Sequence, residues 1–598
     1  MTTWQELEKL NTKEYEDAAD GWGTVSSRAN AAKDRVDNEM LAKLRETQKG
    51  HTATAAIGDL AQLSRNYQYI HTECGLIRTA LNGLASELAG PQKRLKDALA
   101  EAPKTFTVNP DGSVEYPVSP SFLKVPASGS GTASPGAPVP LLPGKAEGGS
   151  DANKALAEQI AENIATALRE AKEIDGRYAG ILRKLKIPDG VKGLDITDAM
   201  FIDAAQDTKN LRKASKYREE SEIPKGKSPA HNAGWWKGLS QEQRDEYTTL
   251  YPASIGALDG LPATVRDDAN RMVFAETRAT YQVELNAIPP EPPKYAKHPG
   301  HGRTVRSEEW KEWNDKYGEK IERLDNSLEG MKSIQQRFDS TGTNGLPEAY
   351  LLGFSAEGTG RAIVANGNPD TADHTAVYAP GTTSNLGSIE GDINRMTQLW
   401  RTSDGMEGSG NVSTITWLGY DAPQSIVKDS PFRHYADDGA PAYNRFMDGL
   451  ETAQGGPDKS HTTVIGHSYG TTLVGAAARQ GDLSADDVIF AGSPGVQVGS
   501  AQEMDVPKGH VWNEDAKGDP VPSLGSWGHG GSQEGGPHFI IPSDNIFGAN
   551  QMSTDTEGHS DYWKKDSQSL MNQAAVVTGN YGAVQQLEPE SVWRGPQR

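Results

Sequence analysis

The order of apolar and polar residues divides the chain into a helical first half and a second half in which strands alternate with helices. Over residues 1 to about 102, apolar residues recur every three or four positions, which is the spacing of one helix face. The clearest stripe consists of Ile57, Leu60, Leu63, Tyr67, Ile70, Cys74, Ile77, Leu81, Leu84 and Leu88. The turn-prone segment "TQKGHTAT" separates it from a less regular stripe. The pattern predicts two long helices folded into a hairpin.

The segment after this hairpin predicts a short strand pair and then a linker. "TFTVNPDGSVEYP" alternates as a small β-hairpin does, with Asp111-Gly112 at its turn. From Ala127 to Ser150, six glycines, four prolines and four serines occur among 24 residues. Such a stretch cannot bury enough apolar surface to order itself, so we predict a linker. Helical spacing returns from Leu156 to Leu185, and Ser240 followed by Gln243 suits a helix start.

Beyond about residue 345, short β-prone runs alternate with helical segments. The runs are "AYLLGFS", "RAIVANG", "HTAVYAPG", "STITWLGY", "HTTVIGHS", "DVIFAGSPG" and "GHVWNEDAKGD". Alternation of strand and helix predicts a mostly parallel sheet with helices on both faces. We therefore predict four parts: a helical hairpin domain at 1–116, a linker at 117–150, a helical region at 151–340, and an α/β domain at 341–585 that the helical region packs on or covers. A charged helix is expected from about Ser307 to Phe338, at the end of the helical region.

Charge and composition narrow the classes of partner. The net charge of −21 over 598 residues argues against nucleic acid or an anionic membrane as the main partner. The single cysteine, Cys74, allows neither an internal disulfide nor a Cys-rich metal site. No run of 18 apolar residues occurs, so no membrane span is expected. The first twenty residues lack the basic start and apolar core of a signal peptide. We expect a cytoplasmic protein, or one exported without a cleavable leader.

The candidate nucleophile is Ser468, in the stretch "TTVIGHSYGTTLVGAAA". The bare Gly-x-Ser-x-Gly pattern is weak in a chain with 64 glycines. Its surroundings strengthen it, because a β-branched strand runs into Ser468 and a helix of small residues leaves it. A sharp strand-to-helix turn would lift the serine hydroxyl above the sheet edge, and Gly466 and Gly470 would leave the necessary room. The following helix would present backbone N–H groups to a developing oxyanion, with Tyr469 N–H as the first donor.

The remaining parts of an acyl-transfer site follow in chain order. Thr382, with Gly381 as the alternative, is the candidate second oxyanion donor, because this loop follows a predicted strand. Asp519 in "GDPV" is the preferred acid, with Asp515 and Glu514 as alternatives. His559, in a loop before the last helix, is the preferred base. His529 and His538 are its alternatives, while His467 and His461 lie too near Ser468 in sequence to serve easily.

The order Ser, Asp, His is that of the α/β-hydrolase arrangement. Other site motifs are missing, since the sequence holds no His-Glu-x-x-His, no Cys-x-x-Cys and no phosphate loop. A Ser-His-Asp mechanism needs neither a metal nor an organic cofactor, so none is expected.

The C-terminal half resembles an actinobacterial α/β-hydrolase family catalogued as a domain of unknown function. The matching pieces, in order between about 235 and 565, are "GWWKGLS", "YPASIGALDGLPATVRDDANR", "WLGYDAP", "GHSYGTT", "AGSPGV", "GDPV", "IFGAN" and "HSDYW". The resemblance implies an α/β-hydrolase fold for the α/β domain and Ser468 as its nucleophile. It also favours Asp519 and His559 over their alternatives, and it implies no substrate.

The N-terminal hairpin resembles, in pattern, the WXG-type helical modules linked to type VII export. Trp22 is followed directly by Gly23, whereas those modules carry Trp-x-Gly between their helices. The resemblance implies a possible export route and a helical protein partner for residues 1–116.

The sequence thus predicts a serine hydrolase that cleaves an ester or related acyl bond of a small-molecule or lipid-like substrate. One alternative is a non-catalytic binding protein that works through its N-terminal helices, on a hydrolase fold kept as a scaffold. A third hypothesis joins the two, as an exported effector hydrolase whose helices serve delivery.

Overall fold

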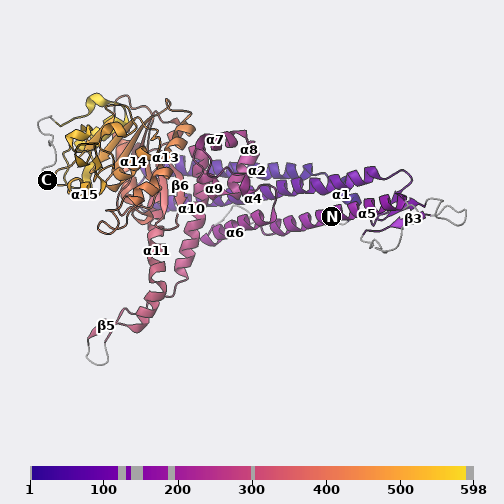
Figure 1. Ribbon diagram of the computed structural model, residues 1–598. Coiled ribbons are helices and arrows are strands. Elements are labelled where there is room, and N and C mark those ends of the chain that lie inside the picture. The colour runs from indigo at the N-terminus through magenta and orange to yellow at the C-terminus, as the bar shows by residue number, and fades with distance from the viewer. Residues whose placement is uncertain (1–2, 119–129, 136–151, 186–195, 298–302, 588–598) are drawn as a thin grey trace. The chain divides into compact units, whose positions relative to one another are not determined.

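The structure is a computed structural model that describes residues 3–118, 130–135, 152–185, 196–297 and 303–587. Contacts divide the chain into two compact units. The first consists of Met1–Ala31, Tyr67–Leu194 and Asp203–Glu222, and the second of Ala32–Asn66, Asp195–Ile202 and Ile223–Arg598. Both units are built from segments that are not consecutive in sequence, and the predicted domain limits stay a prediction. Figure 1 follows the chain by residue number.

The predicted pair of long helices is present near the N-terminus. The chain forms α1 (Trp4–Lys9), α2 (Lys13–Arg35), the π-helix η1 (Val36–Leu41), α3 (Ala42–Thr47) and, after a short break, the 51-residue α4 (His51–Glu101). Within the first unit, the Ser26 hydroxyl lies 2.9 Å from the Nδ1 atom of His71, which joins α2 to α4. Cys74 packs beside Ala29 and Ile70 and is fully buried. Burial, together with the nearby Glu73 carboxylate, raises the pKa of the Cys74 thiol to about 12.

A small antiparallel sheet, one further helix and most of another belong to the first unit. Strands β1 (Thr107–Val108) and β2 (Val114–Pro117) form the predicted hairpin, and Gly112 takes φ +87° at its turn. β3 (Ser130–Ala133) lies inside the predicted linker and pairs with β2. The remainder of that linker prediction, at 119–129 and 136–150, lies outside the described residues. α5 (Ala152–Leu182) and α6 (Asp198–Ala214) follow.

The second unit is organised around an eight-stranded sheet of order β15-β12-β11-β10-β8-β9-β7-β6. The strands are β6 (Ala349–Ser355), β7 (Arg361–Asn366), β8 (His374–Ala379), β9 (Val412–Leu418), β10 (His461–His467), β11 (Asp487–Ala491), β12 (Val511–Glu514) and β15 (Asn550–Gln551). All pairs from β15 to β9 are parallel, and β7 pairs antiparallel with both β9 and β6. The seven predicted strands are confirmed, and the sheet is mostly parallel as predicted.

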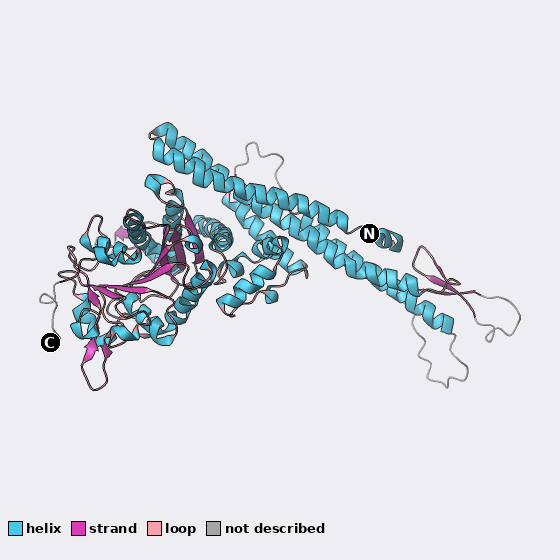
Figure 2. Cartoon of the chain, turned by 90° about the horizontal axis from the view of Figure 1, so that it is seen from above, coloured by secondary structure: helices cyan, strands magenta, loops and turns pink. Residues whose placement is uncertain are grey.

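Helices cover both faces of this sheet (Figure 2). Alternate strand residues divide between two cores. Val464 of β10 belongs to the core shared with α13 (His434–Gln454) and α14 (Tyr469–Gln480). Its neighbour Ile465 belongs to the core shared with α12 (Ile389–Asp404) and α16 (Gln568–Val577). This burial on both faces explains why the strands appear in sequence as short apolar runs.

The segment before the sheet forms further helices. They are α7 (Pro229–Gly238), α8 (Gln241–Leu250), α9 (Pro252–Gly256), α10 (Ala263–Asn286) and α11 (Glu308–Asp339), with the strand pair β4 (Tyr295–Lys297) and β5 (Thr304–Arg306) before α11. Ser240 and Gln243 form a capping box at the start of α8, as predicted. Ser307 caps α11, the predicted charged helix.

Helix α10 is bonded to the backbone of the outermost strand, β6. Asp267 accepts the Leu351 N–H at 2.6 Å, and Asn270 donates to the Leu351 carbonyl at 2.9 Å. Arg271 donates to the Ala349 carbonyl at 2.8 Å. These contacts satisfy part of the polar edge that β6 would otherwise leave open.

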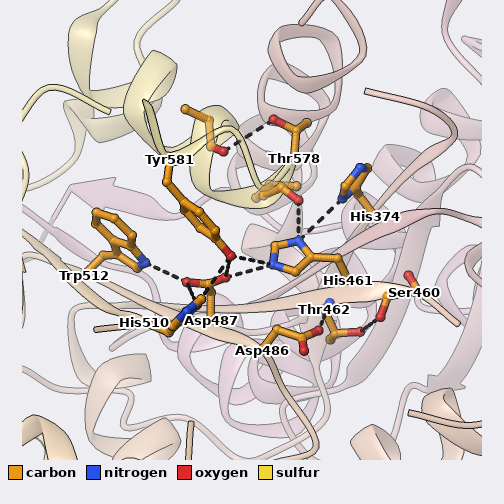
Figure 3. A network of polar contacts seen from close by, with 12 residues as sticks. His374, Ser460, His461, Thr462, Asp486, Asp487, His510, Trp512, Thr578 and Tyr581 are labelled. Carbon is orange, nitrogen blue, oxygen red and sulfur yellow. Dashed lines mark hydrogen bonds and ion pairs between the residues drawn. The ribbon is translucent and has the colours of Figure 1, made fainter. Parts of the chain in front are cut away.

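A polar cluster lies at the N-terminal ends of the parallel strands (Figure 3). The fully buried carboxylate of Asp487 accepts hydrogen bonds from Trp512 and Tyr581, both at 2.7 Å, and lies 2.8 Å from the Nε2 atom of His461. The other ring nitrogen of His461 lies 3.0 Å from the Val577 carbonyl. We call this group the His461 cluster; its members are His461, Asp487, His510, Trp512 and Tyr581. It ties the chain after α16 to strands β10, β11 and β12.

Candidate active site

Ser468 lies on a sharp turn between β10 and α14. Its backbone has φ 55° and ψ −130°, a conformation that non-glycine residues rarely adopt. The two flanking glycines make the turn possible. A Cβ atom on Gly466 would lie 2.7 Å from the Cα of Thr471, and one on Gly470 would collide with the Ala379 carbonyl. The turn therefore has the form that the sequence predicted.

The loop after β8 contacts this turn. A Cβ atom on Gly381 would lie 2.6 Å from the Cβ and 3.1 Å from the Oγ of Ser468, so only glycine fits there. Thr382 follows, and its hydroxyl lies 2.8 Å from the Ser430 hydroxyl. Tyr469 is the first residue of α14, so its N–H has no partner within the helix. Gly381, Thr382 and Tyr469 all line the same cavity as Ser468.

His559 and Asp519 form a hydrogen-bonded pair. The His559 Nδ1 atom lies 2.8 Å from Oδ2 and 3.0 Å from Oδ1 of Asp519. The Asp519 side chain is fully buried and also accepts from the Tyr562 hydroxyl at 2.7 Å and the Val521 N–H at 2.9 Å. Burial alone raises the pKa of Asp519, but the hydrogen bonds from His559, Tyr562 and Val521 outweigh it and hold the pKa below its usual range. The carboxylate is therefore charged at neutral pH.

The alternative acids lie in other surroundings. Glu514, the last residue of β12, is fully buried and accepts from the Ser569 hydroxyl at 2.7 Å and the Gln573 amide at 2.9 Å. Burial raises the pKa of Glu514 to about 8. Asp515 is exposed. Asp519 is thus the one of the three predicted acids that the structure brings into contact with His559.

The alternative histidines have other partners. The Nε2 atom of His529 lies 2.7 Å from the Ser430 carbonyl, and burial lowers the pKa of His529 to about 4. His538 lies 3.0 Å from the Ser532 hydroxyl, through Nδ1. His461 belongs to the cluster at the opposite end of β10, and His467 supports His559 as described next.

Three residues that the sequence did not single out as site members contact the His559–Asp519 pair. His467, buried beside His559 with ring centroids 4.7 Å apart, donates from Nε2 to the His559 carbonyl at 2.8 Å. Burial lowers the pKa of His467 far below its usual range, so the ring is neutral. Tyr562 donates to Asp519. Gly492, at φ +57°, leaves no room for a side chain, since its Cβ would lie 2.6 Å from Oδ2 of Asp519 and 3.0 Å from Nδ1 of His559.

A cavity of about 730 Å³ opens over the turn. Ser468 and His559 both line it, together with the loop after β8, the first residue of α14 and residues of α15 (Val521–His529). The volume is within the range of pockets that hold small organic ligands. The cavity therefore brings the predicted nucleophile, base and oxyanion donors to one surface.

Comparison with known proteins agrees with this architecture. Residues 355–527 match a family model described as alpha/beta hydrolase. The C-terminal half of this chain has the α/β-hydrolase fold. The matched segment of the hydrolase domain contains Ser468 and Asp519 and ends before His559.

Mycobacterial relatives extend the similarity. The chain is 26% identical over 468 residues to the uncharacterized protein Rv2079 of Mycobacterium tuberculosis. The aligned region covers 72% of this chain and 67% of that protein. It is also 32% identical over 178 residues to the uncharacterized protein Mb0988c of Mycobacterium bovis. That alignment covers 28% of this chain and 66% of the relative. The similarity thus reaches beyond the matched hydrolase segment.

Two further findings concern the described residues. None of their helices is both long enough and apolar enough to cross a bilayer. Nor do they contain a group of three or more His, Cys, Asp or Glu side chains arranged to hold a metal ion.

Proposed function

We propose that this chain is a serine hydrolase that cleaves a carboxylic ester or related acyl bond through an acyl-enzyme intermediate. The observation that carries the proposal is the 2.8 Å hydrogen bond between His559 Nδ1 and Asp519, beside a cavity that Ser468 and His559 both line. The match to an alpha/beta-hydrolase family supports hydrolytic chemistry in general.

In the first half of the reaction, the Ser468 Oγ atom attacks the acyl carbon while its proton passes to Nε2 of His559. Asp519 accepts from the Nδ1–H, which leaves Nε2 free to take that proton and stabilises the imidazolium that forms. The negative charge that develops on the acyl oxygen accepts hydrogen bonds from the Tyr469 N–H and the Thr382 N–H, with Gly381 as the alternative donor. Collapse of this intermediate expels the alcohol, which takes the proton from His559.

In the second half, His559 takes a proton from water, and the resulting hydroxide attacks the acyl-enzyme carbon. The tetrahedral intermediate uses the same oxyanion donors and releases the carboxylic acid, while the proton on His559 returns to Ser468. One ester and one water thus give one acid and one alcohol. The proposed substrate is a small-molecule or lipid-like acyl compound.

The proposal can be tested by labelling with a fluorophosphonate probe, which reacts with activated serines. We expect the wild-type protein to be labelled and Ser468→Ala not to be. Ser484→Ala is the matched control, because Ser484 also sits at a positive φ, 47°, but does not line the cavity; it should be labelled as the wild type is. An unlabelled wild type, or a labelled Ser468→Ala protein, would contradict the proposal.

A further inference from the structure

Apolar side chains are unusually exposed beside the cavity. Among the described residues, the four most exposed large apolar side chains are Val427 (83%), Ile426 (74%), Leu524 (74%) and Trp527 (63%). We call these four residues the apolar lip. Ile426, Leu524 and Trp527 line the cavity directly. Because contact between such side chains and water costs free energy in proportion to their area, their gathering at one cavity indicates a surface that an apolar ligand covers.

The two segments that carry the lip are held together by polar contacts. The Arg433 Nε atom donates to the Gly528 carbonyl at 2.6 Å, and His529 Nε2 donates to the Ser430 carbonyl at 2.7 Å. Helix α15 is also packed closely against Pro494, since a Cβ atom on Gly525 would collide with that residue. These contacts hold α15, which carries Leu524 and Trp527, beside the segment that carries Ile426 and Val427.

The lining contributed by the loop after β8 and by α12 is different in character. It consists of hydroxyl side chains and an ion pair: Thr382, Thr383, Ser384, Ser388, Asp392 and Arg395. Arg395 lies 2.7 Å from the Asp392 carboxylate and 2.9 Å from the Tyr378 hydroxyl. Attraction to Tyr378 and Asp392 raises the pKa of Arg395, so it stays charged. These groups suit a partner with hydroxyls and would be poorly paired against a hydrocarbon chain.

We propose that the substrate of this site is an ester of a medium-length fatty acid with a hydroxyl-bearing alcohol. The acyl chain lies along the apolar lip. The alcohol part faces the hydroxyl and ion-pair lining. This inference rests on the proposed function of Ser468, and it adds the class of acyl ester that reaches that residue.

The chain-length preference of hydrolysis tests the acyl part. With p-nitrophenyl acetate, butanoate and octanoate below their micelle concentrations, kcat/KM should rise at least about tenfold from acetate to octanoate, because each buried methylene contributes up to about fourfold. Leu524→Ser and Trp527→Ser should each lower the octanoate-to-acetate ratio by about threefold or more. Ile546→Ser is the matched control, since Ile546 is 46% exposed and does not line the cavity; its ratio should equal that of the wild type.

A flat chain-length profile in the wild type would overturn the inference, and so would an unchanged ratio in both lip variants. If the variants impair only hydrolysis of micellar or vesicular esters, the lip contacts a lipid surface and the proposal is also wrong.

A second pair of substrates tests the alcohol part. Monooctanoylglycerol should be cleaved faster than methyl octanoate, and the reverse order would overturn the assignment of the alcohol side. Fluorophosphonate labelling separates the two levels: a labelled Ser468 with a flat profile rejects only the acyl-chain proposal, whereas an unlabelled and inactive wild type rejects the proposed function itself.

Discussion

A substitution at Gly492 should have two effects: it displaces the Asp519–His559 pair, and it places a side chain on a left-handed backbone. Alanine there would bring a Cβ atom within 2.6 Å of the Asp519 carboxylate and 3.0 Å of the His559 ring. We expect Gly492→Ala to lower kcat by more than about tenfold, because the pair must move. Gly579→Ala is the control, since Gly579 has φ +66° and a Cβ atom added there would meet no atom within 4 Å. It should share the cost of the left-handed backbone, about 1 kcal/mol of the free energy of unfolding, without a change in kcat. Equal kcat values for the two variants would contradict this account.

Tyr562 has a hydroxyl that stabilises the Asp519 carboxylate, and a second tyrosine provides its control. Tyr562→Phe should lower kcat about tenfold, as expected for the loss of a hydrogen bond to a charged group. Without this donor, the carboxylate attracts the His559 proton more strongly, so the acid limb of the pH profile of kcat/KM should move to higher pH. Tyr581→Phe removes a hydroxyl that donates to Asp487 at the same distance, 2.7 Å, but at the other end of the sheet. Its pH profile should match that of the wild type, and a common shift in both variants would point to a general loss of stability.

At the residue scale, the sequence predicted the candidate catalytic residues but not the residues that contact and position them. Ser468, Asp519 and His559 follow one another in a recognisable order, and the last two lie within hydrogen-bond distance. Their catalytic roles stay a prediction. Gly492 and Tyr562 contact the His559–Asp519 pair from segments far apart in sequence. No local sequence pattern predicts such contacts. The positive φ of Gly492 inside "AGSPGV" is a conformation that glycine permits without requiring it.

Among the elements, β10 connects two polar groups, with Ser468 after its C-terminal end and the His461 cluster at its N-terminal end. Burial alone lowers the pKa of His461, but hydrogen bonds to Asp487 and to the Val577 carbonyl, with attraction to Asp487 and Asp486, raise it above its usual value of 6.5. Protonated His461 therefore stabilises the fold. This contribution is fully present below about pH 6.5 and is lost as the pH rises through the raised pKa.

The difference in free energy of unfolding between the wild type and His461→Gln should accordingly be larger near pH 5.5 than near pH 8.5, as measured by urea unfolding followed through tryptophan fluorescence. Asp487 does not disturb this window, because its pKa is lowered and its contribution is lost only at more acid pH. His374→Gln is the control: burial and the charge of His461 lower the pKa of His374, so its effect has the opposite sign with pH. A difference that grows toward alkaline pH would exclude a protonated His461.

The predicted strands were confirmed because each is buried on both faces and so forms a short apolar run. The attachment of α10 could not be predicted in the same way. Its contacts with β6 are made by Asp267, Asn270 and Arg271, three polar residues that a pattern of apolar positions assigns to the solvent-exposed side of a helix. β15, with two residues, is too short to show a period at all.

At the scale of the whole molecule, the polar contacts of α10 with β6 make the stability of the sheet depend on the segment that precedes it. A chain starting at residue 341 would lose the groups that bond the backbone of Ala349 and Leu351, leaving an open edge at β6. We expect residues 341–598 to be less soluble, and to unfold at a lower temperature, than residues 223–598, which keep α10 and α11. Thermal unfolding followed by near-ultraviolet circular dichroism measures this. Equal melting temperatures would show that α10 is dispensable for the hydrolase fold.

The helical partner and the export route suggested by the N-terminal pattern belong to this same scale and stay predictions. A pattern of two helices without further chemistry favours many kinds of partner, so the sequence could indicate the shape of this region better than its role.

The one sulfhydryl of the molecule, on Cys74, is fully buried, and with a pKa of about 12 it is almost never a thiolate at neutral pH. The folded chain should therefore behave toward maleimides and other thiol reagents as if it had no cysteine. A cysteine introduced at an exposed position, such as Leu524→Cys, would be the sole point of attachment for a fluorophore or spin label. The native protein is thus ready for site-directed labelling, without the removal of any natural cysteine.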